Sequence, residues 1–493
     1  MTAPDPRDLL DRHARARARR AGWEPLWQEC YDYALPLRDG AAAPAGAKRG
    51  DRLFDGTAPD AVDQLAASLL AQLAPPWSRW FGFQPGPDLP AAAQDGVAAA
   101  LEAAAETVQA HFDRSNLAVE LHQAFLDLAT AGTACLLFEE APPGGLSAFR
   151  FQALPLADLA LEEGPDGRLS TAWRRHEMTL AELRARWPTA ELPAALLRDG
   201  AKDPALRWPV VESVQADDAA HGHYAVLDAD PPLLLAAGRF ATSPFIAFRW
   251  LKAPGEGYGR SPVMKALPDI KTANKVVELV LKNASIAVTG IWQADDDGVL
   301  NPAAIRLQPG TIIPKAVGSA GLTPLQPPGR FDVSQVVLDD LRSRIRRALL
   351  ADRLAPLEAP RMTATEVLER SAEMARLLGA TYGRLQAELL TPLVLRGLAI
   401  LRRRGEVPDF PLDGRSVALV HRSPLAQAQA QRDATAVLRW LESAAALGPE
   451  ALAAIDAAAA ARWLGRAFGV PPELLRASPA PAPSAAEAAD ATA

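Results

Sequence analysis

The chain has 493 residues, of which 49% are hydrophobic and 23% charged, a balance typical of a folded protein of about two to four domains. Its formal net charge of −7 disfavours a protein that coats nucleic acid with its whole surface, because such proteins are strongly basic. Two cysteines, Cys30 and Cys135, are too few for a disulfide framework and favour a reducing compartment. No apolar run reaches the ~18–20 residues that cross a bilayer, and the basic N-terminus is not followed by the apolar segment of a secretion signal.

The first half of the chain alternates helical and strand-like patterns. Apolar residues at three- and four-residue spacing predict three helical segments: one over 7–35, one capped by Asp60, and a pair over 95–131. Short apolar runs then predict strands after Gly132, over 149–178 and over 208–250, with one short helix at 179–187. A mixed α+β architecture is therefore expected for this half.

The pattern changes after Trp250. A glycine-rich turn, GEGYGRS at 255–261, begins a long helical pattern over 262–288. Residues 288–327 lose that period and look rich in short β-strands, and helical spacing returns over 331–351. This order predicts two helices that flank a β-rich insert.

The last third of the chain is predicted to be mainly helical. After a proline-containing loop over 352–362, Thr363 begins a capping box for a helix that reaches about residue 404, with a kink or break at Pro392. Alanine-rich helices follow over 432–476. The low-complexity segment 477–493 is expected to be disordered.

No motif carries the signature of a catalytic or metal site. The turn 255–261 is the stretch most similar to a phosphate-binding loop, but it lacks the Lys-Ser/Thr ending of a P-loop and the full dinucleotide fingerprint. His221 and His223 would share one face of a strand, but a metal site needs further ligands. The run Asp295–Gly298 resembles the start of a calcium loop, in which Arg306 takes the place of the final glutamate. We interpret these stretches as a helix-capping turn and surface loops, and we expect no enzyme and no cofactor.

Arginines gather near the end of the helix predicted over 331–351. Arg342 and Arg346 share one helix face, whereas Arg344 and Arg347 point elsewhere. Cations at a helix C-terminus interact favourably with the helix dipole, so a solvated or subunit-facing surface is one interpretation. Contact with a nucleic-acid backbone is the other, and the sequence leaves both open.

Four stretches in order along the chain carry a family resemblance. They are a small-residue helix that ends in proline and aromatic residues (57–83), a helix with a glycine turn and a strand (117–139), a G-x-x-Y-G-R-S turn before a long helix (254–292), and a helix with a T-A-x-E-V start and an E-L-x-x-P-L-V run (361–398). Together they resemble the head-to-tail connector, or portal, proteins of short-tailed double-stranded DNA phages. The third stretch is the most specific, and the resemblance covers about residues 5–475.

This resemblance implies a mainly helical α+β portal fold that assembles as a homo-dodecameric ring at one capsid vertex, around a channel for double-stranded DNA. The implied regions are a wing (1–260), a first stem helix (261–288), a clip (289–330), a second stem helix (331–351), a tunnel loop (352–362), a long wing helix with the segment after it (363–429), a helical crown (430–476) and a disordered tail (477–493). A stem helix of ~27 residues would span about 40 Å, enough to cross a capsid shell.

The resemblance also implies partners and positions. The partners are further copies of the chain, a tail adaptor, the large terminase subunit, and the capsid and scaffolding proteins, without a membrane. The location is the portal vertex of the virion, after assembly in the host cytoplasm. The DNA channel would include Arg342, Arg346, Arg353 and Arg361. The stem turn would comprise Gly257, Gly259, Arg260 and Ser261.

Two further expectations follow from the ring. A cyclic ring requires two different contact faces on each subunit, and the tryptophans are candidates for them. An acidic chain suits a channel through which DNA must slide without being gripped.

Arginine far outnumbers lysine (44 against 8), which favours a phage or prophage of a GC-rich bacterium. The alternative to all of this is a soluble nucleotide-binding enzyme that uses the loop 255–261.

Overall fold

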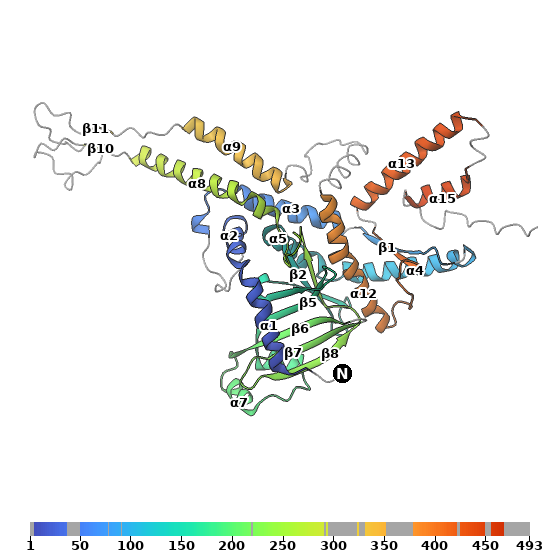
Figure 1. Cartoon of the computed structure of the whole chain (residues 1–493), viewed down its shortest axis with the longest axis horizontal. Coiled ribbons are helices and arrows are strands. Elements are labelled where there is room, and N and C mark those ends of the chain that lie inside the picture. The colour runs from blue at the N-terminus through green and yellow to red at the C-terminus, as the bar shows by residue number, and fades with distance from the viewer. Residues whose placement is uncertain are drawn as a thin grey trace, which may run out of the picture.

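The computed structural model of the chain describes the following residues: 4–36, 50–76, 78–89, 91–217, 220–289, 292–293, 323–324, 331–351, 378–421, 424–448 and 455–467. A body of two β-sheets and several helices carries two helical arms, which project in different directions (Figure 1). One arm consists of α8 (Pro262–Thr289) and α9 (Phe331–Ala348), and the other of α13 (Pro424–Ala446) and α15 (Ala457–Ala467). Of the helices in these ranges, none is long and apolar enough to cross a bilayer.

The N-terminal segment forms two helices. The segment 7–35 is helical as predicted, but the prediction of a single helix is wrong. α1 (Pro6–Ala21) ends at Gly22, and α2 (Glu24–Ala34) begins two residues later. Pro25 lies in the first turn of α2, where its missing N–H costs no hydrogen bond. The break lets α1 lie across the larger sheet while α2 packs in the main core (Figure 1).

Three helices follow. They are α3 (Thr57–Leu73), α4 (Ala91–Asp113) and α5 (Leu117–Ala131), so the predicted pair with a break before residue 117 is confirmed. The predicted cap is wrong: α3 begins at Thr57, and Asp60 lies in its first turn. The N-cap position is occupied by Gly56, and Asp55 before it accepts a hydrogen bond from the Thr57 N–H (3.0 Å) at the start of the helix.

The strands form two main antiparallel sheets. In the smaller one, β2 (Thr133–Glu140) lies between β3 (Phe149–Leu154) and β9 (Phe245–Arg249). The larger sheet has five strands in chain order: β4 (Leu159–Glu163), β5 (Leu169–Thr179), β6 (Arg207–Asp217), β7 (Ala220–Leu227) and β8 (Leu233–Phe240). These strands confirm the strand-rich predictions for 133–250. A separate pair joins β1 (Phe81–Pro85) to β12 (Val417–His421).

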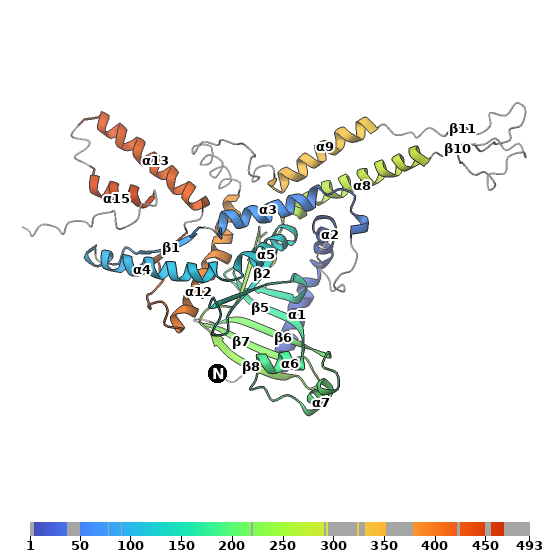
Figure 2. The ribbon, with the colours of Figure 1, turned by 180° about the vertical axis from the view of Figure 1, so that it is seen from behind.

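Both faces of the five-stranded sheet are covered. On one face, Leu9 and Ala16 of α1 pack against Trp173. On the other, α6 (Leu180–Arg186) and α7 (Ala194–Lys202) pack against β6, β7 and β8, as Figure 2 shows from behind. Thr179 caps α6 through a complete capping box, which confirms the predicted threonine cap. The largest core cluster lies elsewhere, among α2, α3, α5, the smaller sheet and the bases of α8 and α9.

The later helices lie close to their predicted ranges. The pattern over 262–288 corresponds to α8, and that over 331–351 to α9. At the outer end of this arm, β10 (Trp292–Gln293) pairs with β11 (Thr323–Pro324). Residues 378–385 are α-helical and continue through a π-helical turn (Gln386–Leu390) into α12 (Thr391–Arg403).

Pro392 lies where the π-helical turn meets α12. The helical course continues through it, so the irregularity predicted there takes the form of a π-helical turn and not a break. Several predictions lie outside the described residues: most of the β-rich insert 289–330, the loop 352–362, the capping box at Thr363 and the tail 477–493.

Candidate functional site

The glycine-rich turn lies at the base of α8, against the junction of α5 and β2. Gly259 passes so close to Gly132 that a Cβ added to Gly259 would lie 2.1 Å from the Gly132 carbonyl oxygen. Gly132 ends α5 with φ of 78°, a left-handed conformation that glycine adopts without strain. The Gly259 N–H donates to Thr133 Oγ1 (2.8 Å), and the Ser261 hydroxyl donates to the Thr130 carbonyl (2.8 Å). Two backbones are therefore fixed in contact at the start of the arm.

Two larger side chains hold the other side of this turn. Tyr258 is buried, and its hydroxyl accepts a hydrogen bond from the Leu161 N–H (3.0 Å). Burial raises the pKa of Tyr258. Arg260 lies over the Trp23 ring, 5.2 Å from the ring centroid, and pairs with Glu256 (2.8 Å). The turn is thus anchored to the larger sheet through Tyr258 and to the N-terminal helices through Arg260.

The same contacts argue against phosphate binding by residues 255–261, all of which the structure describes. A phosphate loop needs several free backbone N–H groups that converge on one point. The N–H groups of Glu256, Gly259 and Arg260 instead donate within the protein. Ser261 Oγ accepts from the Met264 N–H (2.9 Å) and so caps α8. The structure supports the helix-capping interpretation and gives no support to the nucleotide-binding alternative.

Arg249, at the end of β9, joins four segments beside the turn. Its side chain is fully buried, and all five N–H donors of the guanidinium have an acceptor. The acceptors are Glu388 in the π-helical turn (2.6 Å), Glu163 at the end of β4 (3.1 Å), and the carbonyl oxygens of Gly257 (3.1 Å) and Gly167 (3.1 Å). Arg249 therefore connects the long helix, both sheets and the turn before α8.

Glu163 has a second cation beside it. Burial acts to raise the pKa of Glu163, but hydrogen bonds from Lys252 and Arg249 outweigh burial and hold this pKa below its usual value. Glu163 is consequently ionised at neutral pH and balances part of the buried charge. The cluster of Arg249, Glu388, Glu163 and Lys252 is called the Arg249 cluster below.

A second polar cluster holds the base of the α8–α9 arm. The Asp55 side chain is buried and pairs with Arg342 of α9 (2.9 Å). Asn274 of α8 accepts hydrogen bonds from the N–H groups of Phe54 (2.6 Å) and Asp55 (3.1 Å). Burial acts to raise the pKa of Asp55, yet the hydrogen bonds from Thr57 and Arg342 lower it overall. Both helices of the arm are thus fastened to the segment that precedes α3.

The arginines predicted to line a channel have different surroundings. Arg342 pairs with Asp55, and its neighbour Arg344 pairs with Asp269 of α8 (2.9 Å). Arg346 is half-buried on the same helix, whereas Arg353 and Arg361 lie outside the described residues. The ion pairs give Arg342 and Arg344 a part in holding the arm together. A role in a DNA channel for Arg342, Arg346, Arg353 and Arg361 stays a prediction.

The histidine pair on β7 has no metal-site geometry. His223 lies beside Glu212 of β6 (3.8 Å), together with His176 (3.6 Å) and Arg186 (3.0 Å), whereas His221 lines a cavity. Burial opposes ionisation of Glu212, but these partners lower its pKa to about 2. No group of three or more His, Cys, Asp or Glu side chains in the described ranges has an arrangement that could hold a metal ion. The Asp295–Gly298 run lies outside those ranges.

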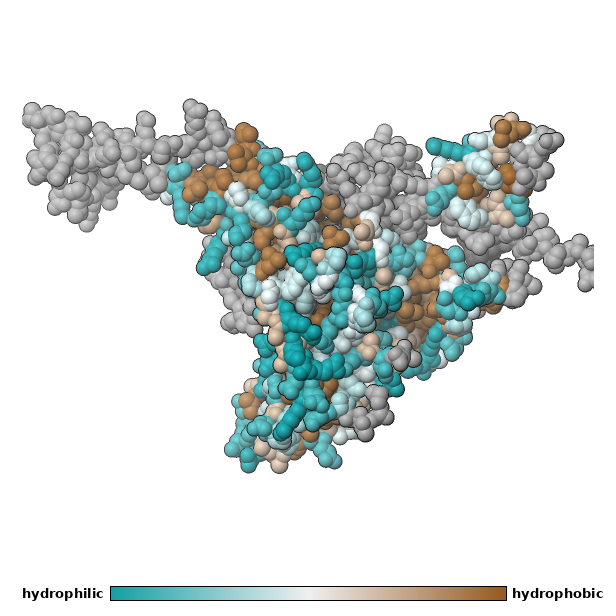
Figure 3. Space-filling model, in the orientation of Figure 1, coloured by the Kyte–Doolittle hydropathy of each residue, from teal (hydrophilic) through white to brown (hydrophobic). Residues whose placement is uncertain are grey.

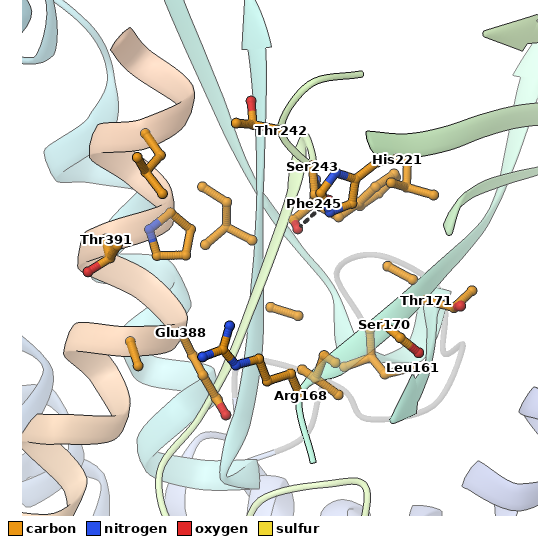
Figure 4. A pocket seen from close by; sticks show the side chains of 18 of the residues that line it. Leu161, Arg168, Ser170, Thr171, His221, Thr242, Ser243, Phe245, Glu388 and Thr391 are labelled. Carbon is orange, nitrogen blue, oxygen red and sulfur yellow. Dashed lines mark hydrogen bonds between the residues drawn. The ribbon is translucent and has the colours of Figure 1, made fainter. Parts of the chain in front are cut away.

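The cavity has a volume of about 740 Å³ and lies between the larger sheet, β9 and the helix over 378–403 (Figure 4). Thr171, His221 and Thr242 line its sheet side, and Glu388 lines its helix side. The charged groups in the lining have partners, since Arg384 pairs with Glu388 (3.1 Å) and Arg168 lies 3.9 Å from Asp166. No isolated charge therefore defines a ligand for this cavity.

Most of the tryptophans in the described residues belong to the core of the subunit itself. The buried ones are Trp27, Trp80, Trp173, Trp187 and Trp250. Trp440 on α13 and Trp463 on α15 are exposed. Among the tryptophans whose side chains the structure describes, these two are the most exposed and remain candidates for subunit contacts.

His13 makes the packing of α1 sensitive to acid. It is buried beside Trp173, and burial together with Arg17 lowers its pKa from 6.5 to about 4. The unfolded chain binds this proton near pH 6.5 and the folded chain only near pH 4, so the free energy of unfolding should fall by about 1–3 kcal/mol as the pH drops through that window. Urea unfolding of His13→Leu at several pH values should show a shallower slope. His13→Asn separates titration from packing: it should be less stable than His13→Leu but should show the same shallow dependence of unfolding free energy on pH. A dependence as steep as that of the natural protein in either variant would contradict the role of His13.

Comparison with known proteins identifies a family model and several relatives that are similar to this chain in sequence. The family model described as "Bacteriophage head to tail connecting protein" matches residues 7–475. The chain is 26% identical over 479 residues to the "Probable portal protein" of Bordetella phage BPP-1, covering 90% of this chain and 84% of that one. It is 24% identical over 488 residues to the portal protein of Salmonella phage epsilon15, covering 92% and 85%. The match to the portal protein of Enterobacteria phage T3 is 27% identical and covers 34% of this chain and 32% of that one.

These matches define a structural protein of phage particles. Because the family model spans nearly the whole sequence, the chain belongs to the family of bacteriophage head-to-tail connecting, or portal, proteins. The resemblance inferred from the four sequence stretches is confirmed. Among solved structures, a chain from "Virion of native gene transfer agent (GTA) particle" is similar over 88% of this chain and 99% of that one, with a TM-score of 0.38 and 12% identity. That likeness is too distant to support a finer assignment.

Proposed function

We propose that twelve copies of this chain form a ring at one vertex of a phage capsid, and that double-stranded DNA enters and leaves the head through its central channel. The observation that carries the proposal is the family match over residues 7–475. A ring at the junction of head and tail is a way for one polypeptide to surround DNA, and cyclic symmetry needs only one repeated heterologous contact.

The proposed regions follow the order of the elements. Residues 1–260 would form the wing, and α8 and α9 the stem. The insert 289–330 would form the clip that receives the tail adaptor and the terminase, and the loop 352–362 the tunnel loop. The long helix lies within 363–429. α13 begins at Pro424, shortly before the proposed crown (430–476), and extends into it, and α15 lies within the crown. The 28 residues of α8 correspond to about 40 Å of helix, and this length supports a stem that crosses the capsid shell.

The charge of the chain suits this role. The net charge of −7 limits attraction to DNA phosphates, and a protein that gripped many phosphates would slow the passage of DNA. Arg342 and Arg344 already have acidic partners within the subunit. The channel is therefore proposed to guide DNA weakly and to leave the energy for packaging to the ATP-hydrolysing terminase.

The native mass of the purified protein tests the ring. A dodecamer of 52.5 kDa chains should have a mass of ~630 kDa by light scattering, and negative-stain images of the same fraction should show rings with a central hole. A ring of another subunit number would correct the count but keep the architecture. A protein that stays at 52.5 kDa at every concentration tested would contradict the proposal.

A further inference from the structure

Exposed apolar side chains gather on the outer half of the α8–α9 arm. The exposed fractions are 49% for Leu279 and 53% for Leu281 on α8, and 72% for Val336 and 45% for Val337 on α9. Figure 3 shows apolar surface on this arm. The seam between the two helices is already filled, since Leu338 and Leu341 are buried. The four exposed residues are therefore additional to the arm's own core and are available for contact with another chain.

Three of these residues lie on two opposite faces of the arm. Leu281 follows Asn274 by seven residues, which is about two helical turns, so both lie on the side that faces the segment 52–55. Leu279 lies two residues earlier, about 200° around the helix and thus on the other side. Val337 precedes Arg344 by seven residues and shares its side. We name the first side the Asn274 face and the second, with Leu279 and Val337, the Arg344 face.

This arrangement points to one kind of partner. A two-fold dimer would use a single self-complementary face, whereas a cyclic ring places one face of a subunit against a different face of the next. We infer that the Arg344 face of one copy packs against the Asn274 face of the neighbouring copy, with Leu279 and Val337 of the first covering Leu281 of the second. This inference rests on the proposed ring and assigns residues to its contact.

The charges at the edges of the two faces are compatible with this contact. Lys275 lies one turn before Leu279, at the edge of the Arg344 face; its side chain is 61% exposed and pairs with Glu278 of the same helix (2.9 Å). Asp339 lies three residues before Arg342, which places it on the Asn274 face, and it is exposed. Opposite charges at the rim of an interface favour the correct register and contribute little to affinity. The buried area of Leu279, Leu281 and Val337 would supply most of the stabilisation.

Cross-linking of introduced thiols tests the contact. The natural thiols, Cys30 and Cys135, are buried, and burial raises the pKa of each to about 12, so they should not react. The double variant Leu279→Cys/Leu281→Cys has one thiol on each face. Treated with a flexible bis-maleimide, it should give a ladder of species up to the full ring on a denaturing gel. Each single variant alone should stay monomeric, and the two single variants co-expressed should give dimers and nothing larger.

The control places the second thiol elsewhere. Leu146 is 85% exposed on the loop between β2 and β3, so Leu279→Cys/Leu146→Cys should give no ladder. Rings of the expected native mass without a ladder from the double variant would overturn this inference and leave the proposed function intact. Dimers from Leu279→Cys alone would indicate a two-fold contact and would also overturn it. Failure to form any ring would overturn the proposed function itself.

Discussion

Gly259→Ala should destabilise the chain by at least ~3 kcal/mol, because the added Cβ would lie 2.1 Å from the Gly132 carbonyl oxygen. Neither backbone can move away without losing a hydrogen bond. The Gly132 carbonyl accepts from the Trp250 N–H (2.9 Å), and the Gly259 N–H donates to Thr133. Urea unfolding followed by circular dichroism should show a lower midpoint, and less of the protein should assemble into rings.

Gly257→Ala is the matched control. A Cβ added at Gly257 has no atom within 4 Å, and the contact with Arg249 uses the Gly257 carbonyl, which alanine keeps. This variant should unfold like the natural protein and assemble normally. Equal unfolding midpoints for the two variants would refute the close approach of the turn to the α5–β2 junction. Loss of a measurable nucleotide affinity in Gly257→Ala would instead revive the phosphate-loop alternative.

Local patterns in the sequence were sufficient for most helices and strands. The apolar spacing over 262–288 and 331–351 predicts α8 and α9 because each helix turns a row of apolar residues toward the core cluster. Thr179 caps α6 as predicted because a capping box is formed within four residues. Signals of this kind depend on neighbours in the chain and can be read without knowing the fold.

The contacts between distant segments could not be predicted in this way. Asp60 was the expected cap of α3, but the helix begins at Thr57, whose N–H donates to Asp55. Asn274 and Arg342, more than 200 residues away, hold Asp55 and its segment in place. The Arg249 cluster was missed altogether. Its one local signal is an arginine at the end of the apolar strand Phe245–Arg249, and its partner Glu388 is 139 residues further along the chain.

Arg249→Met should cost about 3–5 kcal/mol of stability, because it removes the buried cation beside Glu388 and leaves this largely buried carboxylate with only the partly exposed Arg384 as a partner. Arg249→Lys should fall between this variant and the natural protein, since an ammonium keeps the charge but cannot reach all four acceptors in the geometry of a guanidinium. The double variant Arg249→Met/Glu388→Met should lose less than Arg249→Met alone, because it removes both charges. Urea unfolding of the four proteins measures these differences.

The cluster also predicts where the loss of stability appears. Arg249 contacts both Glu388, in the long helix, and Gly257, in the turn at the base of α8. A π-helical turn is a less regular part of a helix and depends on such contacts to keep its geometry. Hydrogen exchange in Arg249→Met should therefore accelerate together in the peptides that contain residues 386–390 and 255–261, with the α6–α7 region unchanged. Faster exchange at only one of the two sites would show that Arg249 does not couple the long helix to the arm.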